Sequence, residues 1–349
     1  MKRFFAVWAV AVLMLFCCGC AAGGPQSFKV QNVDTVMGTV LQQTLYISDR
    51  ETPADQEIAL LLRKLEEERL SRRLETSEVS RLNQAAGEDS GSAVSDFLEE
   101  VLKGCLEIWQ KSGGAFDITL GAVVSLWDID GWASGENQGV FAPPRDEQLR
   151  KALESCGCGR MKIEGGRLYL PEGMELDLGA VGKGIALDQL LVYLREKNEI
   201  TGAVISLGGS ILTYGQKPDG ESWSVGIADP EDTASIIGTL TLEGEWFVST
   251  SGDYERYAEA DGIRYHHIID PATGYPADSG VRGVTILAKE GFLSDALSTA
   301  CFILGEEKGM ELAAGCGVEV LFVGKDGGIT MSEGMKAYFT AAADHSRGE

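Results

Sequence analysis

Two of the three histidines in this chain stand side by side in a segment rich in turn-forming residues. His266 and His267 lie between Tyr265 and Pro276, together with an aspartate, a threonine, a glycine and a proline. Histidine titrates nearest to neutral pH, so this chain places its best proton carriers together. If the segment is extended, the two imidazoles point to opposite faces and one can face a cleft. A purely structural role is the alternative.

A carboxylate and a hydroxyl four residues apart form a second candidate group. Asp295 and Thr299 fall in a predicted helix, where this spacing places both side chains on one face. The pair suits a hard cation such as Mg²⁺, with a carbonyl oxygen and ligand phosphates completing the coordination. The alternative is that Ser294 or Asp295 only caps the start of the helix.

A glycine-rich turn precedes both groups. The segment from Asp177 to Gly184 stands where a predicted strand gives way to a helix, and Lys183 adds a positive charge there. Backbone amides at such a helix start can bind an anion. A Walker A loop is absent, because Gly184 follows the lysine instead of Ser or Thr. Asp177 could bind a ligand hydroxyl or ring nitrogen, or cap the helix. A further glycine turn, Gly113 to Asp117, could admit a planar ligand.

The N-terminus has the features of an export signal. Lys2 and Arg3 precede the apolar run Phe4 to Phe16, which is too short to span a bilayer comfortably. The segment resembles a bacterial lipoprotein signal with Cys20 as the lipidated residue; a plain cleaved signal is the alternative. We therefore predict an extracytoplasmic protein, lipid-anchored to the bacterial cell membrane. The predicted organisation is a signal peptide at 1–19, a tether at 20–29 and one functional domain at 30–340.

Composition excludes some classes of function. The formal net charge of −23 disfavours binding to nucleic acid or other polyanions. Five cysteines follow Cys20, an odd number without the spacing of a zinc site. Whether Cys156 and Cys158 pair with each other is left open.

The remaining pattern predicts mixed helices and antiparallel strands, and thus an α+β fold. We expect a hairpin around Met37 to Thr39 and another around Gly165 and Gly166. The predicted helices are 52–69, 77–83, 93–111, one opening within 116–127, 179–197, 292–304 and 306–314. The other predicted strands are 203–207, 222–228, 239–242, 247–249, 281–288 and 318–323.

Eight short motifs occur along the chain in the order typical of one known family. Over Val30 to about Tyr338 the chain resembles the ApbE family of FAD:protein FMN transferases. The matching segments are Met37 to Thr39, Ser77 to Asn83, Gly114 to Thr119, Asp177 to Gly184, Ser206 to Gly209, Thr250 to Gly252, His267 to Pro271 and Asp295 to Thr299. Two positions differ from the family pattern: Ser210 replaces an acidic residue that is often present, and Arg73 replaces an aromatic residue found in some members.

The resemblance implies a bilobed α+β fold related to the tunnelling fold, with FAD bound in a cleft between the lobes. It also implies the residues of the site. The FAD contacts would be Met37, Ala115, Phe116, Asp117, Asp177, Lys183, His267 and Ile268. The Mg²⁺ ligands would be Asp295, Thr299 and the carbonyl oxygen of Ala180.

The implied reaction is Mg²⁺-dependent transfer of FMN from FAD to a Thr or Ser hydroxyl of an acceptor protein, releasing AMP. His267 would activate the hydroxyl, Asp270 could orient His267, and Asp295 would act through the metal ion. The implied partners are flavin-acceptor subunits of Rnf- or Nqr-type complexes or other exported electron-transfer proteins. Two alternatives remain: an FAD diphosphohydrolase releasing FMN and AMP, and a non-catalytic flavin-binding lipoprotein.

Overall fold

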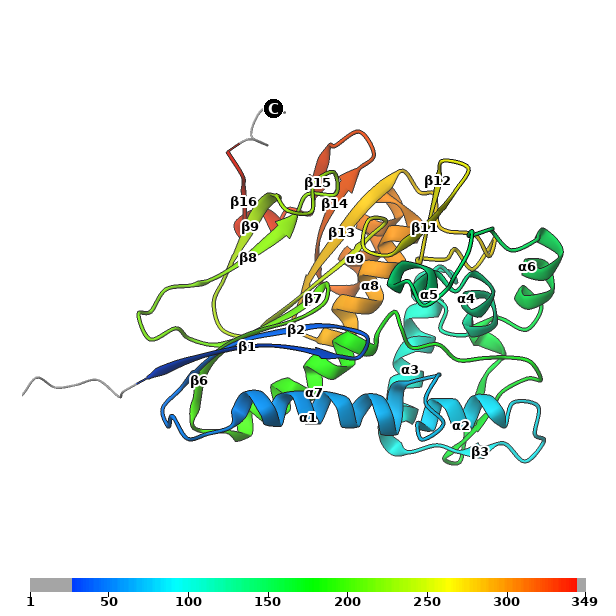
Figure 1. Ribbon diagram of the computed structural model, residues 1–349, viewed down its shortest axis with the longest axis horizontal. Helices are drawn as coiled ribbons and strands as arrows, with labels where there is room; N and C mark the ends of the chain where they lie inside the picture. The colour runs from blue at the N-terminus through cyan, green and yellow to red at the C-terminus, as the bar shows by residue number, and fades with distance from the viewer. Residues whose placement is uncertain (1–26, 344–349) are drawn as a thin grey trace, which may run out of the picture.

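The computed structural model describes residues 27–343 (Figure 1). The predicted signal peptide, Cys20 and most of the predicted tether lie outside these residues. The first strand begins at Phe28, inside the range predicted as tether. Within residues 27–343, no helix combines the length and apolarity needed to cross a membrane.

An eight-stranded antiparallel sheet forms the framework of the fold. Its spatial order is β1-β2-β6-β7-β10-β13-β14-β15. The first hairpin turns through Met37 and Gly38, which both have positive φ (51° and 67°), as a tight hairpin turn requires. The predicted hairpin is thereby confirmed. The strands are β1 (Phe28–Val36), β2 (Thr39–Ile47), β6 (Ile200–Leu207), β7 (Ser210–Gly215), β10 (Trp246–Gly252), β13 (Val281–Ala288), β14 (Glu319–Gly324) and β15 (Ile329–Met331).

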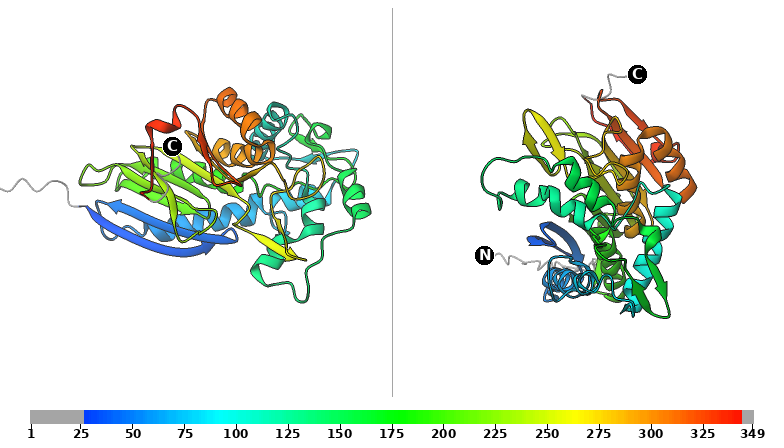
Figure 2. Two further views of the ribbon diagram at one scale, coloured as in Figure 1. Left: turned by 90° about the horizontal axis from the view of Figure 1, so that it is seen from above. Right: turned by 90° about the vertical axis from the view of Figure 1, so that its right-hand side faces the viewer.

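Each face of this sheet is covered by a different layer. Alternate residues of β13 show this: Val284 and Ile286 pack in the core with helix α8 (Gly291–Leu304), whereas Leu287 packs against a second sheet. Helices α1 (Ala54–Leu65) and α7 (Gly182–Glu196) lie on one side of β1, β2 and β6, and β8 (Trp223–Ala228) and β9 (Ile236–Leu242) lie on the other (Figures 1 and 2). The second sheet has the order β16-β9-β8, formed by β16 (Phe339–Ala341), β9 (Ile236–Leu242) and β8 (Trp223–Ala228).

Helices and short strands gather at the end of the molecule towards which the β1–β2 turn points (Figure 1). A small sheet of β3 (Ser92–Ala93), β5 (Arg167–Tyr169) and β4 (Lys162–Glu164) lies in this region, as does the hairpin of β11 (Tyr257–Ala260) and β12 (Ile263–His266). The α-helices are α1 (Ala54–Leu65), α2 (Glu78–Gln84), α3 (Asp96–Lys111), α4 (Gly121–Trp127), α5 (Ile129–Ser134), α6 (Asp146–Leu153), α7 (Gly182–Glu196), α8 (Gly291–Leu304) and α9 (Glu306–Cys316). A π-helix (Glu66–Leu70) extends α1, and 3₁₀ turns occupy Cys158–Arg160 and Met335–Ala337.

The α+β class and most of the long elements agree with the sequence prediction. The main differences are local. Helix α7 begins at Gly182, three residues later than predicted, because Gly179 to Val181 form a turn instead. Strand β7 was not expected, since the two-residue turn Gly208–Gly209 returns the chain directly from β6. Cys156 and Cys158 are both free thiols.

The crossing of α7 and α8 is unusually close and places the site. A Cβ added at Gly184 would overlap the carbonyl oxygen of Gly291, and would lie 2.6 Å from that carbonyl carbon. Only glycine allows the two backbones to approach this far. The approach brings the amide of Gly184 to the side chain of Asp295, one turn into α8.

Candidate active site

Two adjoining cavities share a wall near the first turn of α7. The smaller has a volume of about 150 Å³ and the larger about 630 Å³. Together they bring most of the predicted site residues into one cleft. The residues that line both cavities are Arg73, Asp130, Asp177, Gly179, Lys183, Thr250, Glu255 and Arg256.

Asp295 lies at the base of the smaller cavity and is almost fully held by the protein. Its side chain is 3% exposed. One carboxylate oxygen accepts the Gly184 amide at 2.6 Å, and the other accepts the hydroxyls of Ser210 and Ser249, each at 2.6 Å. The Lys183 ammonium stands 4.0 Å away. These contacts fix the carboxylate and offset the cost of burying its charge.

The oxygen atoms near Asp295 fit a hard cation. A carboxylate offers about four lone-pair positions. Three donors occupy three of these positions on Asp295, which leaves about one for a cation. Thr299, one turn further along α8, has its hydroxyl only 3.5 Å from that of Ser251. Asp295, Thr299 and Ala180 all line the smaller cavity, so the predicted common face is confirmed. No group of three His, Cys, Asp or Glu within residues 27–343 could hold a metal ion. A single carboxylate with neutral oxygens and ligand phosphates is the kind of donor set that suits Mg²⁺.

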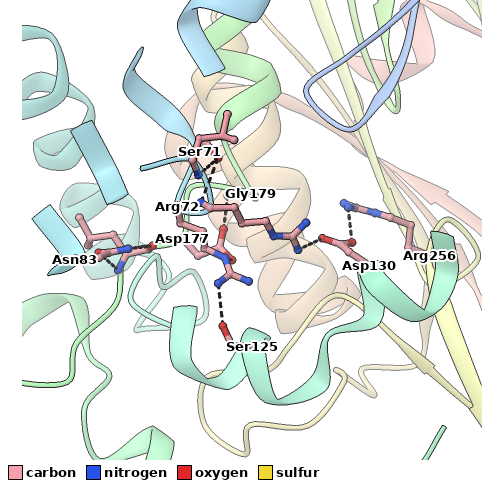
Figure 3. A network of polar contacts seen from close by, with 11 residues as sticks. Ser71, Arg72, Asn83, Ser125, Asp130, Asp177, Gly179 and Arg256 are labelled. Carbon is pink, nitrogen blue, oxygen red and sulfur yellow. Dashed lines mark hydrogen bonds and ion pairs between the residues drawn. The ribbon is translucent and has the colours of Figure 1, made fainter. Parts of the chain in front are cut away.

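Asp177 anchors the turn that leads into α7 instead of capping the helix. Its carboxylate accepts the Gly179 amide at 2.8 Å and pairs with Arg72 Nε at 2.8 Å (Figure 3). The residue before the helix is Val181, so the capping alternative is wrong. Because Asp177 lines both cavities, its carboxylate remains within reach of a bound ligand.

The two adjacent histidines have different environments. His266 is buried away from the cavities; its Nδ1 accepts the Ile268 amide, and its Nε2–H donates to the carbonyl oxygen of Ala277. His267 lines the smaller cavity, and its Nδ1 lies 3.2 Å from the carbonyl oxygen of Arg256. A carbonyl oxygen only accepts, so Nδ1 carries the proton and Nε2 keeps a free lone pair. Burial, reinforced by the charge of Arg256, holds the pKa of His267 well below its usual value.

Asp270 does not orient His267, and this hypothesis is wrong. The carboxylate of Asp270 accepts the Ala272 amide at 2.9 Å and the Thr273 hydroxyl at 3.3 Å. It therefore closes its own turn. The backbone oxygen of Arg256 orients His267 instead, by accepting its Nδ1–H.

The remaining predicted contacts divide between the two cavities. Ala115, Phe116, Asp117 and Ile268 line the smaller cavity, whereas Met37 lines the larger one. Asp117 also holds its own loop, because its carboxylate accepts the Thr119 amide and hydroxyl and the Cys158 amide.

Several residues of the cleft were not identified from the sequence. Ser210 was noted only as a departure from the family pattern, and neither it nor Ser249 was expected to hold Asp295. Glu255 was missed altogether, although it is exposed in the shared wall. Partial removal from water raises the pKa of its carboxyl, and the positive charges of Lys183 and Arg256 act in the opposite direction by lowering it. Glu255 and Arg256 follow, after two intervening residues, a strand end rich in Ser, Thr and Gly, which was the available signal.

Comparison with known proteins identifies the family and agrees with the fold. The model of the ApbE family matches residues 37–322. The chain belongs to the ApbE family. An FAD:protein FMN transferase of Treponema pallidum is 35% identical, with 96% of each chain covered. One from Vibrio cholerae is 32% identical, covering 96% of this chain and 97% of that protein. The crystal structure of the ApbE protein of Thermotoga maritima has a TM-score of 0.79 and 30% identity, covering 90% of this chain and 99% of that one. The ApbE family resemblance is thus confirmed, and with it the α+β fold of the family.

Proposed function

We propose that this chain transfers FMN from FAD to a Thr or Ser hydroxyl of an acceptor protein and releases AMP. The observation that carries the proposal is the convergence of Asp295, Thr299, Lys183 and His267 on one cavity of an ApbE-family fold. Relatives that cover nearly all of the chain are named FAD:protein FMN transferases. A cavity for binding alone would not need this combination of cation ligands and a free imidazole lone pair.

The charges of the cleft support a cation-dependent reaction. Carboxylates outnumber cationic side chains among the residues that line the two cavities. An anionic dinucleotide would be repelled by this surplus unless a bound cation offset it. Asp295, Thr299 and the Ala180 carbonyl would hold Mg²⁺, which supplies charge neutralisation at the phosphoryl oxygens. The carboxylates are Glu66, Asp117, Asp128, Asp130, Asp177, Glu255 and Asp295, and the cations are Arg72, Arg73, Lys183 and Arg256.

In the proposed step, the acceptor hydroxyl oxygen attacks the phosphorus of the FMN half of FAD. A new oxygen–phosphorus bond forms, the bridging bond to the AMP phosphate breaks, and AMP leaves with the bonding electron pair. The hydroxyl proton passes to Nε2 of His267, which is unprotonated at neutral pH because its pKa is lowered. The Lys183 ammonium, which lines both cavities, favours the negative charge of the phosphates.

The biological setting is also part of the proposal. The acceptor would be a subunit of an Rnf- or Nqr-type complex or another exported electron-transfer protein. The enzyme would be tethered to the outer side of the cell membrane through a lipid on Cys20. Labelling of cells with a fatty-acid analogue, compared between the wild type and Cys20→Ala, tests the anchor: loss of label in the variant supports it, and equal labelling refutes it.

The transfer itself is tested with the full-length chain, FAD and MgCl₂, with and without a purified Rnf-type acceptor subunit. AMP is measured by chromatography, and the acceptor mass is measured before and after incubation. We expect AMP and an FMN-modified acceptor, and a loss of at least about 100-fold in Asp295→Asn. Asp278→Ala, an exposed acidic residue outside both cavities, is the control. AMP without a modified acceptor indicates the hydrolase, and neither product indicates binding alone.

A further inference from the structure

One carboxylate joins two arginines from distant parts of the chain across the shared wall of the cavities. Asp130 Oδ1 lies 2.6 Å from Arg256 Nη1 (Figure 3). Asp130 Oδ2 lies 3.0 Å from Arg73 Nη2. Arg73 follows the π-helix, Asp130 belongs to α5, and Arg256 stands between β10 and β11. Three segments of the cleft are thus tied together by a single side chain.

The Arg256 end of this bridge leads directly to His267. The carbonyl oxygen of Arg256 accepts the backbone amide of His267 at 3.1 Å, and its imidazole Nδ1–H at 3.2 Å. The position of this one oxygen therefore determines the tautomer of His267. No carboxylate takes that place, because Asp270 is engaged in its own turn. The orientation of the imidazole depends on how firmly the backbone at Arg256 is held.

Asp130 is itself held in a defined position. The chain between α4 and α5 passes through Asp128 in the left-handed conformation (φ 42°), which aspartate adopts more readily than most residues with a side chain. The Asp128 carboxylate accepts the Asn137 side-chain amide at 2.8 Å, which stabilises this bend. The bend turns α5 so that Asp130 faces Arg256.

We propose that Asp130 is a positioning residue of the transfer reaction: by holding the Arg256 guanidinium, it keeps the Arg256 carbonyl oxygen on His267 Nδ1 and the Nε2 lone pair free. The inference rests on the proposed function for its kinetic consequence, but its structural part does not. Arg73 is the second anchor of Asp130. The bridge leaves one net positive charge beside the site, since one carboxylate faces two guanidinium groups.

The structural part is tested by nuclear magnetic resonance of the full-length chain. The sequence has only three histidines, so few imidazole nitrogen signals need assignment. The wild type should show His267 with its proton on Nδ1. Asp130→Ala, or the isosteric Asp130→Asn if the alanine variant is unstable, should add a population protonated on Nε2. Asp34→Asn is the matched control, because the Arg63–Asp34 pair has the same 2.6 Å distance and similar exposure but lies outside both cavities. A His267 tautomer unchanged by both Asp130 variants overturns the proposal.

The kinetic part is tested by AMP release from FAD in the presence of MgCl₂ and the purified acceptor subunit. Misplacing a reacting group by a small distance lowers rates strongly, so kcat of Asp130→Asn should fall by about 10- to 100-fold. This fall should exceed any change in the Kd for FAD, measured by flavin fluorescence. Arg256→Ala should cause a similar loss, and the double variant should lose no more than about twofold beyond the larger single loss. Losses that multiply in the double variant overturn the inference.

The two proposals fail in different ways. If the wild type neither releases AMP nor modifies an acceptor, the proposed function is wrong, whatever the state of His267. If the wild type is active but the Asp130 variants keep the His267 tautomer and kcat, the positioning role is wrong and the transferase remains.

Discussion

The contact between α7 and α8 gives a prediction that depends on one methyl group. In Gly184→Ala the new Cβ would overlap the Gly291 carbonyl oxygen and would lie 3.0 Å from Asp295 Cβ. Forced separation of packed backbones costs about 1–3 kcal/mol. Loss of the Gly184 amide bond to the Asp295 carboxylate adds about 1.5–3 kcal/mol. Alanine regains about 1 kcal/mol of helix propensity. The net destabilisation is therefore about 1.5–5 kcal/mol.

The measurement is urea unfolding of the wild type and the variant, followed by circular dichroism, with the melting temperature as a second readout. Gly315→Ala is the control, because Gly315 lies in α9, is exposed, and has no atom within 4 Å of an added Cβ. The control should be as stable as the wild type or up to about 1 kcal/mol more stable. If Gly184→Ala unfolds at the same urea concentration as Gly315→Ala, the close crossing is wrong, and so is the placement of Asp295 that follows from it.

Three further predictions concern buried polar groups. Ser210→Ala and Ser249→Ala each remove a hydroxyl that donates to Asp295, and each should lower the free energy of unfolding by about 1–3 kcal/mol. Ser224→Ala, at an exposed position, is the control and should not lower it. Equal urea midpoints in all three variants would contradict the hydrogen bonds. Burial raises the pKa of Asp188 to about 6. The contribution of its protonated carboxyl to the free energy of unfolding is therefore complete below pH 4 and is lost as the pH rises through 6. The stability of the wild type relative to Asp188→Asn should therefore fall by about 2 kcal/mol between pH 4 and pH 7.5, and a constant difference would refute this. Burial also raises the pKa of Cys158 to about 12, so alkylation at pH 8, followed by peptide mapping, should label this thiol only after unfolding; rapid labelling of the native protein would show that it is accessible.

Local patterns in the sequence were sufficient for the regular elements and for part of the site. The period of apolar residues predicted β13 with its correct bounds and α8 to within one residue. The four-residue spacing of Asp295 and Thr299 correctly placed both on one face of α8. The alternation in an extended segment correctly separated His266 from His267.

Contacts between distant segments could not be read in the same way. Asp270 is three residues from His267 and was the natural candidate to orient it, yet a short turn allows its carboxylate to bind its own backbone first. Ser210 and Ser249 are 85 and 46 residues from Asp295 and meet it only because β7 and β10 are neighbours in the sheet.

The sequence alone determined the family, the α+β class and the residue types available for chemistry, because motifs and periodicities are properties of neighbouring residues. Only the tertiary structure decided which oxygen orients His267, which hydroxyls hold Asp295, and that Asp130 joins Arg73 to Arg256. These choices depend on the packing of α7 against α8 and on the bend at Asp128. Such contacts are set by the distances between elements in space, which no local pattern of residues specifies.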